Sequence, residues 1–445
     1  MGNFRYSIYS PHSIDIPHSR EMDQVTNTFS KFKLFALLLS LLVLGLNIPK
    51  VTTILFPLLV LIWARFRARF MLETLLLLMF SISYYFISAY YRVIPFDVAV
   101  KYTVITPSAY LLGAYIRWDR LSFWPYNTIL AVEAIGMGFV LFSFFSFRYT
   151  MSHYGYLISD RQFVSIWTGE ATNGIGLATY SGALIALVPA SMVGLTRLWR
   201  GKSPLFTRVF LGLVFCSVIV MGTLGGYINA YMQNRGFLLM FFLVCTIVFI
   251  YYFCRQNFIT FLTAIMISLV VSIIFYYILI NFIDINRSAN ILSYRLNAAK
   301  FHTPRFHLWI EGLKNIFENP WGNTKINYKL LGGELYYHNL WLDIVRVSGI
   351  IPVLFLLAFQ LKHVRSVFII LRKSEYPLLE ISIISITIFI IFIYQCEPVM
   401  DFSENFFCFT IFILGIIKYL GKAMDDKTKE TPPEKETGRD SALKL

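Results

Sequence analysis

The sequence contains few charged residues for its length. Of its 445 residues, 14% are Asp, Glu, Lys or Arg and 57% are hydrophobic, whereas a soluble globular domain carries roughly 25% charged residues. A chain of this composition does not have enough polar side chains for a water-soluble globular fold. The composition therefore predicts an integral membrane protein.

Cysteine is also scarce, and no Cys-x-x-Cys pair occurs. Disulfide frameworks and zinc sites both depend on characteristic cysteine spacings. Neither a disulfide framework nor a zinc site is expected here. The five cysteines all lie within or at the ends of apolar runs: Cys216, Cys245, Cys254, Cys396 and Cys408.

The net charge of +14 is spread over many short segments of the chain. Nucleic-acid-binding proteins gather basic residues on one face, whereas membrane proteins place them in short loops on the cytoplasmic side. We therefore expect the lipid bilayer, and no nucleic acid, as a partner. The first apolar run follows about thirty polar residues, unlike a cleavable signal peptide, so we expect the N-terminus to be retained.

Long apolar runs dominate the rest of the chain. A membrane-spanning helix needs about 20 mostly apolar residues. Runs of this kind predict an all-α, polytopic membrane protein with about twelve transmembrane helices, of which the second and tenth are short and adjoin Pro49 and Pro352. The predicted spans are 31–48, 50–64, 71–90, 97–116, 127–147, 174–196, 206–224, 235–253, 258–282, 349–364, 376–395 and 405–421.

Basic residues predict the orientation of these spans. They recur in alternate connections, from the arginines of 65–69 to Lys418 and Lys422. These connections all lie in the cytoplasm if both termini are cytoplasmic. The predicted organisation is a cytoplasmic N-terminal segment over 1–30, a membrane domain over 31–421 and a disordered cytoplasmic tail over 422–445.

Two outer connections, about 148–173 and 283–348, are too long to be turns. Loops of this length are usually functional or carry structure of their own. The larger loop holds eight basic and five acidic residues, which suggests a bound anion, although long translocated loops can also escape the orientation rule. No internal repeat indicates the inverted halves of a secondary transporter.

Apolar residues recur at helical spacing within the larger loop. They predict an amphipathic helix on the outer leaflet that begins near Arg305 and ends at Asn319-Pro320. An arginine at headgroup level can bind a diphosphate through two parallel hydrogen bonds, or it can snorkel and anchor the helix. The apolar face consists of Phe306, Trp309, Ile310, Leu313 and Ile316.

Four other outer residues are candidates for a functional site. Arg235 begins the predicted eighth span, where its charge and the helix amides could bind an anion or anchor the helix. His338 precedes the tenth span and can take a proton at neutral pH, or it is a polar residue of the membrane rim. Arg295 in the larger loop and Arg161 in the shorter one are candidate substrate contacts. The aromatics around Arg161 suit either sugar stacking or an aromatic belt.

The stretch HNLWLDIVRVSGIIP resembles the signature of the O-antigen ligase and O-antigen polymerase superfamily. That signature has His, then Asn, Ser or Gln, then nine residues and Gly, matched here by His338, Asn339 and Gly349. Pro352 departs from it, because the family has Gly, Thr or Tyr at this position.

Two further segments are similar to elements of the same family. Arg235-Gly-Phe-Leu-Leu239 resembles its Arg-x-x-x-Leu element at the outer end of a helix. Arg305 through Gly322 resembles its loop pattern of Arg, Trp, Asn-Pro and Gly. The resemblance covers roughly 220 to 352, with the motifs in the family's order.

The resemblance implies a metal-independent, inverting glycosyltransferase at the outer face of the bacterial cytoplasmic membrane. Its donor would be undecaprenyl-diphosphate-linked oligosaccharide, its acceptor a glycan, and it would need no metal and no cofactor. A chain-length regulator is a further candidate partner, which the sequence leaves open. The family's roles map to diphosphate binding for Arg235 and Arg305 and to the general base for His338. Asn339 and Tyr337 would orient the base or contact sugar.

Several reactions remain open at this stage. Two sizeable outer loops and the departure at Pro352 favour a polymerase of repeat units over a ligase that transfers the chain to lipid A core. A flippase or other transporter would need ionisable residues around a mid-membrane cavity, whereas Glu73, Glu133 and Glu380 are scattered. A membrane scaffold without enzymatic activity would leave the outer arginines and histidine unexplained. No DxD-like acid pair adjoins these residues, so two arginines would serve where other enzymes use a divalent metal.

Overall fold

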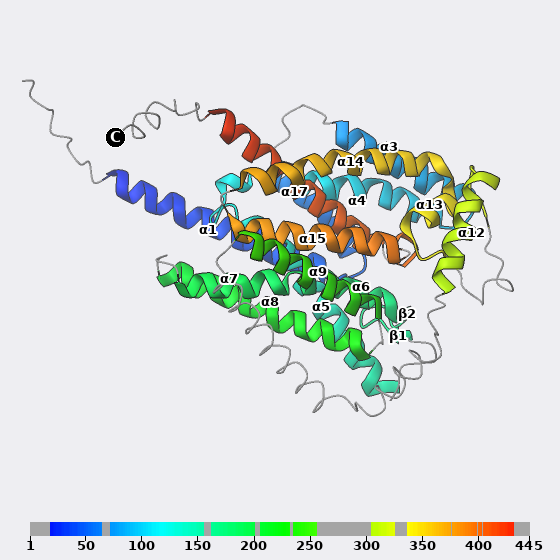
Figure 1. Ribbon diagram of the computed structural model, residues 1–445, viewed down its shortest axis with the longest axis horizontal. Helices are drawn as coiled ribbons and strands as arrows, with labels where there is room; N and C mark the ends of the chain where they lie inside the picture. The colour runs from blue at the N-terminus through cyan, green and yellow to red at the C-terminus, as the bar shows by residue number, and fades with distance from the viewer. Residues whose placement is uncertain are drawn as a thin grey trace, which may run out of the picture.

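The computed structural model of the chain is a bundle of long helices that lie side by side (Figure 1). An all-α fold was expected for a chain so rich in apolar runs, because in lipid a helix satisfies its own backbone hydrogen bonds. The structure describes residues 18–64, 72–154, 162–200, 205–231, 235–255, 304–324, 336–374, 376–397, 399–402 and 404–430.

The first half of the described chain forms five helices, with a short helical turn before the fifth. A small antiparallel sheet follows α5, with Phe163 of its first strand opposite Thr172 of its second. The elements are α1 (His18–Gly45), α2 (Val51–Trp63), α3 (Leu72–Tyr90), α4 (Phe96–Tyr115), η1 (Trp118–Arg120), α5 (Asn127–Tyr154), β1 (Gln162–Val164) and β2 (Ala171–Asn173).

The second half combines long helices with three shorter ones that matter for the site. The short helices α12, α13 and α16 lie beside the ends of the long ones. The elements are α6 (Gly174–Ala186), α7 (Val188–Arg200), α8 (Leu205–Tyr231), α9 (Arg235–Arg255), α12 (Pro304–Glu318), α13 (Leu340–Ser348), α14 (Ile350–Lys373), α15 (Pro377–Cys396), α16 (Val399–Phe402) and α17 (Glu404–Glu430).

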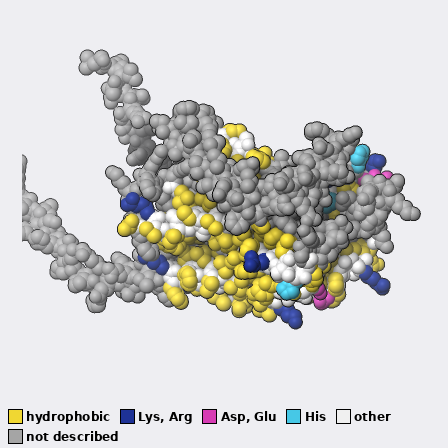
Figure 2. All heavy atoms as spheres, turned by 90° about the horizontal axis from the view of Figure 1, so that it is seen from below, with side chains coloured by type: hydrophobic (Ala, Val, Ile, Leu, Met, Phe, Trp, Pro, Cys, Tyr) yellow, Lys and Arg dark blue, Asp and Glu magenta, His cyan; other side chains and the backbone are white. Residues whose placement is uncertain are grey.

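Six helices among the described residues are long and apolar enough to cross a membrane. Hydrophobic side chains also cover most of the described surface on one face of the bundle (Figure 2). Large exposed apolar surfaces of this kind belong against lipid, which supports a membrane protein. The six segments are Leu72–Tyr90, Asn127–Tyr154, Arg208–Asn229, Ile350–Lys373, Pro377–Cys396 and Glu404–Lys427.

Each predicted span that the structure describes overlaps a helix, but the bounds differ. The helix α1 begins at His18, before the predicted 31, and the tenth span is not short, because α14 continues to Lys373. The predicted span 174–196 is divided between α6 and α7, and 258–282 lies outside the described residues, so the total of twelve spans stays a prediction. Within the predicted disordered tail, α17 continues to Glu430. Asp425 holds it to α14 through an ion pair with Lys373 at 2.5 Å.

Close helix contacts depend on small residues at the centre of the bundle. A Cβ on Gly113 of α4 would lie 2.2 Å from the carbonyl oxygen of Phe412 in α17, and one on Gly415 would lie 2.5 Å from that of Tyr110. Helices in membranes associate through such close backbone approach. Nearby, Lys418 of α17 and Glu73 of α3 form an ion pair at 2.6 Å.

The short elements gather at one end of the bundle, which we call the α13 end. In Figure 1, α12, α13 and the β1–β2 hairpin lie at this end, and the start of α1 and the end of α17 lie at the other. The helices α3, α9, α14, α15 and α17 begin or finish at the α13 end. This arrangement brings together residues from the two predicted outer loops.

Candidate active site

One short helix, α13, fills the interval in sequence between His338 and Gly349. Asn339 caps the N-terminus of α13, where its side-chain oxygen accepts hydrogen bonds from the backbone N–H groups of Trp341 and Leu342 at 3.0 and 3.3 Å. Asn is among the residues that cap helices best. The nine residues of the helix follow, and Gly349 is its C-terminal cap. Asn339 therefore has a structural role, and its amide also donates to the side chain of Gln395 at 2.9 Å.

The backbone of His338 is held in the left-handed region, with a φ of 53°. Asp343 stabilises this conformation from the first turn of α13. Its carboxylate accepts the N–H groups on either side of the histidine, from Tyr337 at 2.8 Å and from Asn339 at 3.1 Å. The imidazole is thus fixed at the start of a helix by local hydrogen bonds, with 7% of the residue exposed.

Tyr337 packs inward rather than toward solvent. It lies in a small apolar cluster with Leu308 of α12 and Leu342 of α13. Burial raises the pKa of its phenol to about 12. The expected sugar contact by Tyr337 therefore has little support from its position, because the ring joins α12 to α13.

The two motif glycines bring the end of α12 against the end of α13. Gly349 and Gly322 have positive φ values of 85° and 87°, and a Cβ on Gly322 would lie 2.6 Å from the backbone nitrogen of Gly349. Ile350 N–H donates to the carbonyl of Pro320 at 2.9 Å. Pro352 is in the first turn of α14, where a proline is tolerated.

Gly349→Ala is expected to destabilise the protein. At φ 85° and ψ −175° a side chain costs about 1–3 kcal/mol in backbone strain. The new Cβ would also lie 2.6 Å from the Pro320 oxygen. The thermal midpoint in detergent should fall, whereas Gly212→Ala, in open space on α8, should leave it unchanged or higher. Equal midpoints for wild type and Gly349→Ala would refute the proposed strain.

Arg305 and His338 meet on two sides of one carboxylate. Arg305 Nη2 is 3.6 Å from Glu397 Oε1, and His338 Nδ1 is 4.0 Å from Glu397 Oε2. Arg305 begins α12, His338 precedes α13 and Glu397 follows α15. The structure therefore joins two residues that the sequence placed at the site and adds an acid that the sequence analysis did not identify.

Glu397 is almost completely buried, with 5% of its side chain exposed. Burial raises its pKa to about 7, and the nearby Arg305 guanidinium partly opposes that rise. Only a weak signal in the sequence indicates this residue: an acid followed by Pro398 stands directly after an apolar run. Acids at the ends of spans are common, however, and proximity to Arg305 depends on the tertiary fold.

The helix α12 has two apolar faces. Leu308 is fully buried against Tyr337, and Trp309 borders the same cluster. The expected single apolar face is therefore divided: Trp309 and Ile316 turn toward the bundle. Arg305 lies on the inward face, one turn before Trp309, with 37% of its side chain exposed. The outward apolar side chains are Phe306, Ile310, Leu313 and Phe317.

Three other predicted site residues have a less complete description. Arg161 and Arg295 lie outside the described residues. Arg235 is the first residue of α9, which packs against α15. Tyr251 of α9 donates to Glu380 of α15 at 2.5 Å. Along the chain, Arg235 lies about as many residues before Tyr251 as Glu397 lies after Glu380. The start of α9 is therefore at the same height in the bundle as the end of α15, where Glu397 lies.

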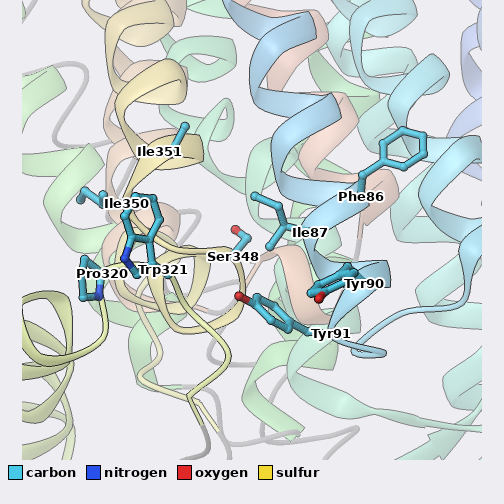
Figure 3. Close-up of a pocket in the computed structure, with 9 residues that line it drawn as sticks. All are labelled: Phe86, Ile87, Tyr90, Tyr91, Pro320, Trp321, Ser348, Ile350 and Ile351. Atoms are coloured by element: carbon cyan, nitrogen blue, oxygen red, sulfur yellow. The ribbon is translucent and has the colours of Figure 1, made fainter.

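An open pocket of about 290 Å³ adjoins the same end of the bundle. Tyr90, the last residue of α3, and Tyr91 lie on one side, Pro320 and Trp321 on the other, and Ser348 lies between them (Figure 3). Its lining is mostly apolar and aromatic. One wall of the pocket is the turn at Pro320 and Trp321, whose backbone conformation depends on the two motif glycines.

Comparisons with protein-family models and with curated proteins find no match for this chain. The resemblance therefore rests on the motif residues themselves and on their positions in the fold. Among the described residues, no group of three or more His, Cys, Asp and Glu side chains could hold a metal ion.

Proposed function

We propose that the protein is a glycosyltransferase of the O-antigen ligase and polymerase type. It would transfer oligosaccharide from undecaprenyl diphosphate to a glycan acceptor in the bacterial cytoplasmic membrane. The observation that best supports this proposal is the meeting of Arg305 and His338, from two separate motifs, around Glu397. A cation for a diphosphate and a base for a hydroxyl are the two groups that such a transfer needs.

The proposed reaction replaces one bond at the anomeric carbon by another. The acceptor oxygen forms a bond to this carbon from the face opposite the diphosphate, and the bond from carbon to the diphosphate oxygen breaks. The electron pair of the broken bond leaves with the diphosphate, and the hydroxyl proton passes to His338. The configuration of the sugar is inverted. The diphosphate is already a good leaving group, so this reaction requires no cofactor.

Arg305 would bind the diphosphate and stabilise the charge that develops on it. The start of α9 supports a second contact, because the amides of a helix N-terminus attract anions and Arg235 begins this helix. Two cations near one diphosphate would perform the task that a divalent metal has in other transferases. The outward apolar side chains of α12 suit a site at the membrane surface, where a lipid-linked donor lies.

Under this proposal the membrane domain has twelve spans and both termini are cytoplasmic. The α13 end would then face the periplasm. We favour a polymerase of repeat units, on the two sizeable outer loops and on Pro352 in the signature. Transfer to lipid A core is the alternative, since the same donor and the same residues serve both reactions.

A transporter has weaker support, because two of the three acids named within the bundle have partners, whereas Glu133 is buried with one oxygen unpaired among the described residues. Glu73 forms an ion pair with Lys418, and Glu380 accepts a hydrogen bond from Tyr251. These partners give both carboxyls structural roles within the helix packing. The residues that best fit a substrate lie instead at the α13 end.

The surface polysaccharide of a strain that lacks the protein tests this proposal. We expect lipid A core that carries a single repeat unit, restored to a normal ladder by the wild-type protein. Core without any repeat unit, together with long lipid-linked polymer, would instead show a ligase. Repeat units that accumulate on lipid at the cytoplasmic face would show a flippase, and an unchanged polysaccharide would contradict any role in its synthesis.

A further inference from the structure

Glu397 occupies an unfavourable place for a purely structural carboxylate. It is the C-terminal cap of α15, where the helix dipole is negative and repels an anion. Its side chain is buried, and Oε2 has no hydrogen-bond partner among the described residues. A buried, poorly solvated acid lowers the stability of the fold. Such groups are concentrated at functional sites, where neighbouring charges are part of the chemistry.

The two oxygens of Glu397 face two different groups. Oε1 is directed to Arg305 at 3.6 Å and Oε2 to His338 Nδ1 at 4.0 Å. Both separations are longer than a hydrogen bond, so a small movement of the carboxylate could strengthen either contact. A catalytic base is commonly oriented by a third group on its far side, and Glu397 has this position relative to His338.

We propose that Glu397 is a positioning residue that changes partners when the donor binds. Without donor it neutralises Arg305; when the diphosphate binds Arg305, the carboxylate is released to His338 Nδ1. This inference rests on the proposed function, because it requires a diphosphate donor and a hydroxyl acceptor at this site.

The exchange follows from competition between anions. The guanidinium fork binds a diphosphate as well as a carboxylate, and the diphosphate carries more charge. The released carboxylate would accept a hydrogen bond from Nδ1, which fixes the tautomer in which Nε2 takes the proton and stabilises the imidazolium that forms. The base would therefore be strengthened only when a donor is present.

The role of Glu397 leaves the proton and electron movements of the proposed sugar transfer unchanged. The acceptor proton moves to Nε2 of His338, the electron pair of the broken bond leaves with the diphosphate, and Glu397 gains no proton. After transfer, the imidazolium loses its proton to water. Departure of undecaprenyl diphosphate would return Arg305 to Glu397. The pKa of Glu397, raised by burial to about 7, is compatible with a carboxylate that depends on nearby cations to stay charged.

The test is Glu397→Gln in the full-length protein, reconstituted in vesicles with undecaprenyl-diphosphate-linked oligosaccharide and acceptor. Removal of the competing charge should lower the KM for donor by about fivefold, as expected for one partly exposed ion pair. Loss of the orienting carboxylate should lower kcat by at least about tenfold. A merely structural residue would not produce these opposite effects, because damage to the site raises KM as it lowers kcat.

Glu380→Gln is the matched control. It makes the same substitution in a buried acid on the same helix, at the opposite end, and should leave both constants close to those of the wild type. Glu397→Asp keeps the charge on a shorter side chain and should retain more kcat than Glu397→Gln. Binding of undecaprenyl diphosphate alone gives a readout without turnover and should be tighter for Glu397→Gln.

The outcomes separate the two proposals. If the wild type transfers no sugar from the lipid diphosphate, the proposed function fails and this inference with it. If the wild type is active but Glu397→Gln weakens donor binding, or changes neither constant, only the role of Glu397 is refuted. If Glu397→Gln fails to fold, a KM for Glu397→Asp that rises in step with the loss of kcat would also refute it.

Discussion

His338→Ala is expected to lower the rate of sugar transfer by about 10²- to 10⁴-fold, the usual contribution of a general base. The expected loss is in kcat, because the histidine acts on the acceptor proton and the donor diphosphate is bound elsewhere. The measurement is the single-turnover rate with saturating lipid-linked donor. His307→Ala provides the control, since His307 is an exposed histidine on α12 and should leave the rate unchanged.

A second substitution separates chemistry from backbone strain at this position. Because His338 has a φ of 53°, alanine there also carries a conformational cost of about 1–2 kcal/mol. Asparagine adopts this conformation more readily but cannot serve as a base at neutral pH. His338→Asn should therefore be nearly as stable as the wild type and as inactive as His338→Ala. A His338→Asn variant with normal activity would eliminate the catalytic role.

Arg305→Lys is expected to reduce kcat/KM for the donor by about 10- to 100-fold, the cost of a lost charge-assisted hydrogen bond of about 1.5–3 kcal/mol. Lysine keeps the positive charge near Glu397 but lacks the planar fork that binds two phosphate oxygens. Arg305→Ala should lose more activity and also some stability, because it leaves the buried Glu397 carboxylate without its cation.

Arg148→Lys is the control for this prediction. Arg148 is an exposed arginine near the end of α5, and the same exchange there should have no effect on kcat/KM. Normal kinetics for Arg305→Lys would favour the alternative in which Arg305 only anchors α12 at the interface, because lysine snorkels as arginine does. A loss confined to donor kinetics supports diphosphate binding.

Local patterns in the sequence predicted the local structure well. The apolar spacing after Pro304 predicts a helix, and α12 begins there and ends at Glu318. The spacing between His338 and Gly349 has a clear physical basis, because Asn339 caps a helix that fills the interval. Such features depend on neighbours in sequence, so they can be read from hydrophobic period and capping residues.

Contacts between distant segments could not be predicted in the same way. Glu397 reaches Arg305 and His338 only because α15 ends beside α12 and α13. Asp343 looked like one acid among five in its loop, yet it holds the backbone on both sides of His338. The inward turn of Trp309 and Ile316 likewise depends on α13 as a second surface, which a single helical period cannot show.

The measurement that tests the central claim most directly uses the purified protein in vesicles with undecaprenyl-diphosphate-linked oligosaccharide as the only sugar donor. We predict products lengthened by whole repeat units, an inverted configuration at each new bond and release of undecaprenyl diphosphate, all of which should be lost with His338→Asn. Unchanged donor and acceptor, with a folded protein and saturating substrates, would contradict the claim that Arg305 and His338 form a transferase site.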